Sequence, residues 1–481
     1  MLSASDKQEP LLPRAADDED GRAFRIWPFA RHNHNVVMTC ILTVFSAAAD
    51  SVWQGTVLTT FLYLSYGSNA MVGYADAARG VFTLLIALPI GYAADRWPRK
   101  SRLIAIGGAL TPLAGGLIIC AVSNLNEESQ MSYTVLVAAL CTWGVIYTIA
   151  RGPVQAIYAG SMRAGERTRF YTVKFQLNNA ASGVGRAGTI LVFASGGDHW
   201  RLADLRLLIY TGLALEGLAA LAMLAFRDSA ILPKDLDAAN QKTATRGTDA
   251  SGSGTADGRR AGSGDGGSAG QPTAHPRAWM VNWILFASSI FFSVGSGMTV
   301  KYFPLFFKED LQLSPVTVQC IFVLMPAANA ALSSLGLRMS KRFGRVQTLL
   351  ILRTSSIVML IVIGAVSMHL RSGHLLEGQS EWTKRLVVVF IVALFLMRSA
   401  LANVPTPIAT SISMDFVPSD QRARWSSLGS IAAAAWSGSA AVGGVLADRY
   451  GYAFVFMLTA AFHVAGTLTQ AILLPIVPKR E

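Results

Sequence analysis

Long apolar runs recur along the whole chain, and they constrain its fold more than any other feature. Each run has about 20 residues or more, long enough for a helix to cross a hydrocarbon core of about 30 Å. Hydrophobic residues make up 52% of the 481 residues and charged residues only 15%, a balance unlike that of a soluble protein. The sequence therefore predicts an all-α membrane protein with twelve transmembrane helices. The predicted spans are 36–64, 70–93, 103–122, 133–159, 173–195, 205–226, 279–307, 315–337, 347–369, 386–412, 424–446 and 452–476.

The loops between these runs differ in their content of Lys and Arg. The basic residues gather in the loops at 96–102, 161–174, 338–345 and 415–424. Because basic loops remain on the cytoplasmic side of a membrane, this asymmetry predicts that both termini are cytoplasmic. It also accounts for the formal net charge of +12 without binding to nucleic acid.

A Gly- and Ser-rich tract at residues 240–277 separates the sixth span from the seventh. Such a composition cannot bury enough apolar surface to offset its chain entropy, so we expect it to be disordered. The segments that begin at Ser161 and Ser413 also resemble each other, which indicates an internal duplication. The predicted division is a cytoplasmic tail at 1–35, a six-helix bundle at 36–226, a disordered cytoplasmic linker at 227–278, a second six-helix bundle at 279–476 and a cytoplasmic tail at 477–481.

Two short loops carry a recognisable motif. Residues 91–100 read GYAADRWPRK, and residues 337–345 of the second half read LRMSKRFGR. Both resemble the Gly-x-x-x-Asp-Arg-x-Gly-Arg-Arg/Lys signature of major facilitator superfamily (MFS) transporters, although Pro98 replaces the usual Gly and Lys341 replaces an Asp. The resemblance implies the MFS fold, in which two pseudo-symmetric six-helix bundles move a solute by alternating access.

By the same resemblance these loops belong to a cytoplasmic gate, and the first loop should carry the gating role because the second, with Lys341 in place of Asp, lacks the carboxylate contact. An Asp at position 95 can pair with nearby Arg side chains and face the N-terminus of the eleventh span. The alternative is that these charges only fix the topology. A similar sequence at 444–451, GVLADRYG, lies at the outer face and is expected to terminate a helix. The predicted gating residues are Gly91, Asp95, Arg96, Arg99, Arg342, Gly344 and Arg345.

Several charged residues fall within predicted spans, where burial at the helix centre costs roughly 2.5 to 3.5 kcal/mol. Asp50 and Arg151 lie at similar depths in the first and fourth spans, so they can either pair with each other or face a substrate. In the superfamily these two spans line the central cavity with the seventh and tenth. The resemblance therefore implies these substrate-binding residues, with Tyr302 as a weaker candidate: Asp50, Trp53, Gln54, Arg151, Arg398 and Asn403.

Cations outnumber anions among the charges at mid-span. The cations are Arg79, Arg151, Arg186 and Arg398, and the carboxylates are Asp50 and Glu216. Because Arg presents a planar fork of donors, the excess favours an organic anion as the solute. The two carboxylates are candidate proton carriers.

Three further features lie within or near the spans. Asp76 and Lys301 are close enough to the outer surface for their side chains to reach it, and His463 is expected to be a hydrogen-bonded packing residue. The Gly152-Pro153 pair is expected to loosen the fourth span near the midplane, and Pro405 and Pro407 are expected to loosen the tenth. Such kinks suit a carrier whose bundles rock, although Pro is also common in transmembrane helices.

No phosphate-binding loop, metal-ligand cluster or nucleophile elbow is recognisable, so the sequence predicts no enzyme activity, cofactor or metal. The predicted function is secondary active transport of a small organic solute by alternating access, with proton coupling left open. The alternative is an MFS-like membrane receptor or accessory protein without transport activity. The expected partners are the lipid bilayer, the solute and, if transport is coupled, protons. Leu11 and Leu12 loosely match a sorting signal, which leaves both the plasma membrane and an endosomal or vacuolar membrane open.

Overall fold

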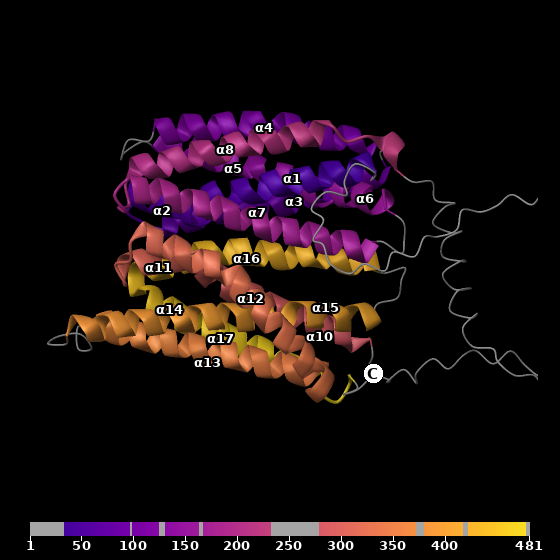
Figure 1. Ribbon diagram of the computed structural model, residues 1–481. Helices are drawn as coiled ribbons and strands as arrows, with labels where there is room; N and C mark the ends of the chain where they lie inside the picture. The colour runs from indigo at the N-terminus through magenta and orange to yellow at the C-terminus, as the bar shows by residue number, and fades with distance from the viewer. Residues whose placement is uncertain are drawn as a thin grey trace, which may run out of the picture.

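The structure, a computed structural model, describes residues 33–96, 99–124, 130–162, 167–231, 279–371, 380–416 and 422–477. Within these ranges the chain forms α-helices and one short 3-10 helix, Asp228–Ala230, and contains no strand. The helices lie in two groups, one above the other in Figure 1. Every one of the twelve predicted spans is helical, which confirms the predicted fold class.

The first group holds the helices of the first six spans. These are α1 (His34–Trp53), α2 (Thr56–Tyr66), α3 (Asn69–Arg96), α4 (Lys100–Ser123), α5 (Gln130–Arg151), α6 (Pro153–Gly160), α7 (Arg167–Ser195) and α8 (Leu202–Leu224). The second group holds α10 (Met280–Val300), α11 (Phe303–Glu309), α12 (Pro315–Phe343), α13 (Arg345–Arg371), α14 (Glu381–Asn403), α15 (Pro405–Phe416), α16 (Arg422–Tyr450) and α17 (Tyr452–Ala471).

Eleven helical segments of the described chain are long and apolar enough to cross a membrane. The remaining predicted span corresponds to α7, which is equally long but more polar and carries Arg186 near its middle. An Arg in such a helix must face protein or a wet cavity rather than lipid.

Four spans are each broken into two helices, and the breaks fall in the first and fourth spans of each group. Gly55, at φ +58°, separates α1 from α2, and Gly152 with Pro153 separates α5 from α6. Lys301 caps α10 just before α11, and Pro405 begins α15 after α14. The breaks at Gly152-Pro153 and Pro405 confirm the predicted kinks. Broken backbone within a membrane is tolerated where it is buried in protein or lines a cavity.

An aromatic cluster fills the interior of the second group. Phe303 on α11 packs on Phe395 of α14 and stacks on Phe456 of α17, with ring centroids 4.5 and 4.9 Å apart. Phe306 and Phe307 complete the cluster, and all five rings are almost fully buried. Close ring packing of this kind stabilises helix association where lipid is as apolar as the side chains.

The two groups meet most extensively where α3 packs along α16. They also meet at the left end of the molecule in Figure 1, opposite to the basic loops, which we call the outer end. There Asp198 Oδ1 accepts a hydrogen bond from Val316 N at 2.8 Å, and Trp200 Nε1 donates to Leu313 O at 3.1 Å. The described residues therefore close the outer end.

Candidate substrate site and outer gate

A cavity of about 520 Å³ lies inside the second group. All of its lining residues fall between Asn282 and Gln470, on helices α10 and α12 to α17 together with Phe303 of α11. Asn282 and Ser413, which hydrogen-bond each other at 2.8 Å, mark its inner limit, near the start of α10 and the end of α15. The cavity therefore extends from the aromatic cluster toward the inner end.

Two arginines from neighbouring helices line this cavity. Arg398 of α14 is 3% exposed, and its guanidinium lies 5.6 Å from the ring centroid of Phe303. Its Nε and Nη2 atoms have no hydrogen-bond partner in the described chain. Arg353 of α13 lies 4.0 Å from the ring centroid of Phe292 and donates from Nη1 to Ala402 O at 3.0 Å, while its Nε has no partner. Arg398 is thus buried and Arg353 half-buried, and three of their guanidinium nitrogen atoms have no hydrogen-bond partner in the described chain.

The cavity wall contains no acidic side chain among its described lining residues. Polar neutral groups, such as Ser296, Asn403 and Gln470, and aromatic rings, such as Trp436, make up much of the rest. Ser296 also contacts Nε2 of the buried His463 at 3.1 Å, so the prediction of a hydrogen-bonded packing role for this His agrees with its position. The electrostatic character of the cavity is therefore positive.

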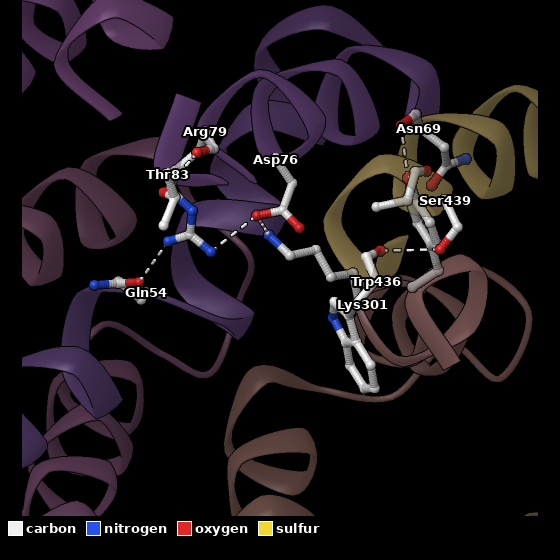
Figure 2. Close-up of polar contacts among 10 residues, drawn as sticks. Gln54, Asn69, Asp76, Arg79, Thr83, Lys301, Trp436 and Ser439 are labelled. Atoms are coloured by element: carbon white, nitrogen blue, oxygen red, sulfur yellow. Dashed lines mark hydrogen bonds and ion pairs between the residues drawn. The ribbon is translucent and has the colours of Figure 1, made fainter. Parts of the chain in front are cut away.

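A chain of polar side chains, which we call the polar chain, crosses the first group and ends in the second (Figure 2). Asp50 and Glu216 lie close enough to interact, and Gln54 Nε2 donates to Asp50 Oδ1 at 2.5 Å. Arg79 donates from Nη1 to Gln54 Oε1 at 3.1 Å and pairs through Nη2 with Asp76 at 2.9 Å. Gln54 is the C-cap of α1 at the break between α1 and α2, and its side chain connects Asp50 to Arg79.

The last link of the polar chain joins the two helix groups. Lys301 Nζ lies 2.6 Å from Asp76 Oδ1, and the Asp76 side chain is only 2% exposed. Figure 2 shows the Lys301 side chain reaching from α10 toward α3. The expectation that Asp76 reaches the outer surface is therefore wrong, because its carboxylate is buried and paired with Lys301, whose side chain is 26% exposed.

A second connection, which we call the Asp448 cap, lies nearer the outer end. The Asp448 carboxylate, near the end of α16, accepts hydrogen bonds from the backbone N–H groups of Asn69 and Ala70, both at 2.9 Å. It also accepts from Ser68 Oγ and Asn69 Nδ2, both at 2.7 Å. An anion at this position satisfies the free N–H groups at the start of α3 and complements the helix dipole.

The segment GVLADRYG was expected to end a helix, and α16 does end at Tyr450, before Gly451 at φ +83°. Sequence reasoning missed that the Asp of this segment caps a helix of the other group. The same Ala-Asp-Arg triplet occurs at the end of α3, at residues 94–96, and this repetition was the signal that could have drawn attention to Asp448.

The six residues predicted to bind substrate do not form one cluster. Arg398 and Asn403 line the cavity, whereas Asp50 and Gln54 belong to the polar chain. Trp53 is fully buried in the first group, where its ring packs edge-on against Trp143 at 5.0 Å. The side chain of Arg151 lies outside the described residues, so the expected pair between it and Asp50 stays a prediction. The weaker candidate, Tyr302, is fully buried and donates to Ala440 O at 2.6 Å.

The predicted gating residues are described only in part. The side chains of Gly91, Asp95 and Arg96 lie outside the described residues, and Arg99 is exposed. Arg342 is also exposed, Gly344 ends α12 at φ +101°, and Arg345 Nη1 donates to Ser411 Oγ at 3.3 Å. The cytoplasmic gate therefore stays a prediction.

Sequence reasoning missed Arg353, which lies in the ninth span within LILRTSS. It stands only a few residues inside the predicted span, where a charge resembles an interfacial anchor. Trp436 was missed because an aromatic residue in an apolar run carries no signal of its own. Among the described residues, no group of three or more His, Cys, Asp or Glu side chains is placed to hold a metal ion.

Two bundles of membrane-spanning helices, broken at equivalent spans around a polar interior, are the architecture of a solute carrier. The profile of the Major Facilitator Superfamily matches residues 39–376, and the chain belongs to this superfamily. It is therefore a multi-pass integral membrane protein of a transporter family, which confirms the prediction that it is not an enzyme. No curated protein sequence matches the chain.

Solved structures share the fold at low sequence identity. A bacterial homologue of the iron transporter ferroportin, in an inward-facing state, matches with a TM-score of 0.64 and 14% identity, covering 91% of this chain and 98% of that one. A D-xylose-proton symporter matches with a TM-score of 0.61 and 14% identity, covering 92% and 97%. The nucleoside transporter NupG matches with a TM-score of 0.58 and 14% identity, covering 91% and 98%.

Proposed function

We propose that this protein is a secondary active transporter that moves a small organic anion by alternating access. The observation that carries the proposal is Arg398, a buried guanidinium in the cavity with two nitrogen atoms that no described protein group satisfies. A buried cation without a partner is costly, and proteins keep such groups where a ligand completes them.

The arrangement of the two helix groups supports alternating access. The Asp448 cap, the Asp76–Lys301 pair and the contacts of Asp198 and Trp200 all hold the outer end closed, while the cavity extends toward the inner end. Breaking these contacts would allow the groups to part on the outer side. The names of the similar proteins mention D-xylose, nucleosides and a homologue of an iron transporter, so they give no consistent indication of the solute for this chain.

The polar chain supports proton coupling. Asp50 and Glu216 are adjacent carboxyl groups inside the first helix group, and two such groups cannot both carry a charge at low cost. One of them is therefore a suitable place for a transported proton. Arg79 connects this pair, through Gln54, to Asp76 at the contact between the two helix groups.

Counterflow in proteoliposomes tests the proposal. Vesicles loaded with an unlabelled organic anion should accumulate the labelled form, and Arg398→Gln should abolish this uptake. The matched control is Arg385→Gln, which removes an exposed cation from the same helix and should leave uptake unchanged. Uptake of a neutral solute that persists in Arg398→Gln would overturn the proposed anion, and ligand binding without counterflow would favour the receptor alternative.

An imposed pH gradient tests the coupling separately. If a proton accompanies the anion, an inward proton gradient should accelerate uptake by the native protein. Asp50→Asn should remove this acceleration but preserve counterflow, because exchange of bound solute needs no net proton movement. A rate that ignores the gradient in the native protein would instead indicate facilitated diffusion.

A further inference from the structure

We infer that the cavity of the second helix group binds an organic dicarboxylate, with one carboxylate held by Arg398 and the other by Arg353. This inference rests on the proposed function for its physiological role, although the binding itself can be measured without transport. It names a second arginine and a narrower ligand class than a simple organic anion.

The two positive charges of the cavity favour a ligand that carries two negative charges. Arginine stays protonated in proteins, so Arg353 and Arg398 together place two positive charges at one cavity. Neither forms an ion pair with a carboxylate in the described chain, and the described cavity wall contains no Asp or Glu. A monoanion would leave one guanidinium uncompensated, whereas a dianion neutralises both.

The hydrogen-bonding geometry fits carboxylates. Nε and Nη2 lie on one edge of a guanidinium and form the fork that takes a carboxylate through two hydrogen bonds. In Arg398 both atoms of this edge lack a protein partner. In Arg353 the Nη1 atom donates to Ala402 O, while Nε lacks a protein partner.

Aromatic rings hold the two guanidinium groups in place. Arg353 lies over Phe292 and Arg398 over Phe303, and these rings belong to different helices, α10 and α11. A cation over a ring face is attracted to it, so each ring helps to hold its guanidinium group in position. Each guanidinium group therefore packs on its own aromatic ring, so the two can bind two separate carboxylates.

The remaining wall indicates an apolar body between the two carboxylates. Phe286, Phe322, Phe395 and Trp436 line the cavity together with the two supporting rings. A volume of about 520 Å³ lies within the usual range for small-molecule sites. An aromatic or short aliphatic dicarboxylate combines these properties.

Melting temperatures of the purified full chain in detergent can test this inference, because a ligand that binds the folded state stabilises it. The probes are two matched pairs, phthalate with benzoate and glutarate with butyrate, at a pH where every carboxyl group is ionised. Each dicarboxylate should bind at least about tenfold more tightly than its monoanion, since it satisfies one more guanidinium. Quenching of Trp436 fluorescence, identified by its loss in Trp436→Phe, gives an independent affinity.

The variants assign each carboxylate to its arginine. Arg353→Gln and Arg398→Gln should each lower dicarboxylate affinity to the level of the monoanion, and Arg385→Gln should leave it unchanged. Arg353→Lys and Arg398→Lys keep the charge without the fork, and they should retain an intermediate preference for the dicarboxylate even if a Gln variant fails to fold.

Equal binding of both members of each pair would overturn the dicarboxylate while leaving anion transport in place. Binding of a dicarboxylate that is unaffected by Arg353→Gln would also overturn the inference. Tight dicarboxylate binding without counterflow would uphold it and reject the transport function. Stabilisation by inorganic phosphate alone would overturn the dicarboxylate in favour of a compact anion.

Discussion

Arg398 combines a buried charge with the absence of a described ion-pair partner, and this combination has opposite effects on stability and on binding. Without ligand, the desolvated guanidinium destabilises the fold, because an unpaired buried ion costs several kcal/mol. Arg398→Gln should therefore melt at a temperature equal to or above that of the native protein in ligand-free buffer. The same variant should lose the stabilisation that organic anions give.

Parallel melts with and without ligand check this prediction, with Arg385→Gln as the exposed control. A ligand-free Arg398→Gln variant that melts several degrees lower would contradict it. Such a result would show that the guanidinium stabilises the empty protein.

Asp76 and Lys301 form one ion pair, but their removal should have unequal effects. Asp76 also pairs with Arg79, so Lys301→Met leaves the carboxylate neutralised. Asp76→Asn instead leaves two cations facing a neutral amide and should destabilise the protein by about 3 to 5 kcal/mol. The melting temperature should fall clearly further in Asp76→Asn than in Lys301→Met, and the reverse order would contradict the geometry.

At the residue scale, sequence reasoning identified a site residue when its chemistry was unusual for its depth. Arg398 is such a case, because a cation at the centre of an apolar run has few structural explanations. Trp53 lies near Asp50 in the sequence but packs into the core, since neighbouring positions on a helix face different directions. The pairing of Asp76 with Lys301 depends on the contact between two distant helices, which spacing along the chain cannot give.

At the scale of elements, α3 and α16 form the main contact between the helix groups, and the Asp448 cap fixes its outer end. The carboxylate makes charge-assisted hydrogen bonds that a neutral amide can only partly replace. Asp448→Asn should therefore weaken closure of the outer end by about 1 kcal/mol, a shift of roughly fivefold in the population of the closed state.

Spin labels on the outer ends of α2 and α12 can measure this shift as a distance distribution. The control is Asp228→Asn, because Asp228 accepts from Ser101 within the first group and does not bridge the groups. An unchanged distribution in Asp448→Asn would show that the cap does not contribute to closure.

Helix breaks were predictable where Pro causes them and less so where it does not. Gly152-Pro153 and Pro405 were found from the sequence. The break at Gly55 depends on a positive φ that many glycines in transmembrane helices never adopt. The break at Lys301 precedes Pro304 in the first turn of α11, a signal that sequence reasoning did not use. Gly and Pro chemistry therefore explains individual breaks, while their common location reflects the shared architecture of the two halves.

At the scale of the whole molecule, closure of the outer end requires close approach of α3 to α16. A Cβ atom at Gly73 would lie 2.5 Å from Ala440 O and 2.6 Å from the Tyr302 hydroxyl. Gly73→Leu should therefore prevent this closure and abolish counterflow. Dicarboxylate binding should persist, because every described residue that lines the cavity belongs to the second group.

The control is Gly116→Leu on α4, where an added side chain meets open space. Counterflow should be unaffected in this variant. Loss of binding together with counterflow in Gly73→Leu would contradict the prediction, because it would show that the cavity depends on the closed outer end.

The overall architecture was predictable because twelve apolar runs and their basic loops leave few alternatives in a membrane. The contacts at the outer end were not, since they join residues that lie far apart in the sequence. Ala-Asp-Arg triplets occur at 94–96 and 447–449, near the ends of α3 and α16, and only spatial contacts show that Asp448 caps the start of α3.

All described residues that line the cavity belong to the second helix group. Solute binding and the proposed proton coupling would therefore lie in different halves of the duplicated chain. Under the proposed function, the second half holds the cargo, and the first half carries the acidic pair of Asp50 and Glu216. Cargo preference should then be able to diverge through changes in residues 279–477 without rebuilding the first half. A chimera that joins this second half to the first half of a related carrier should inherit the ligand preference of its second half.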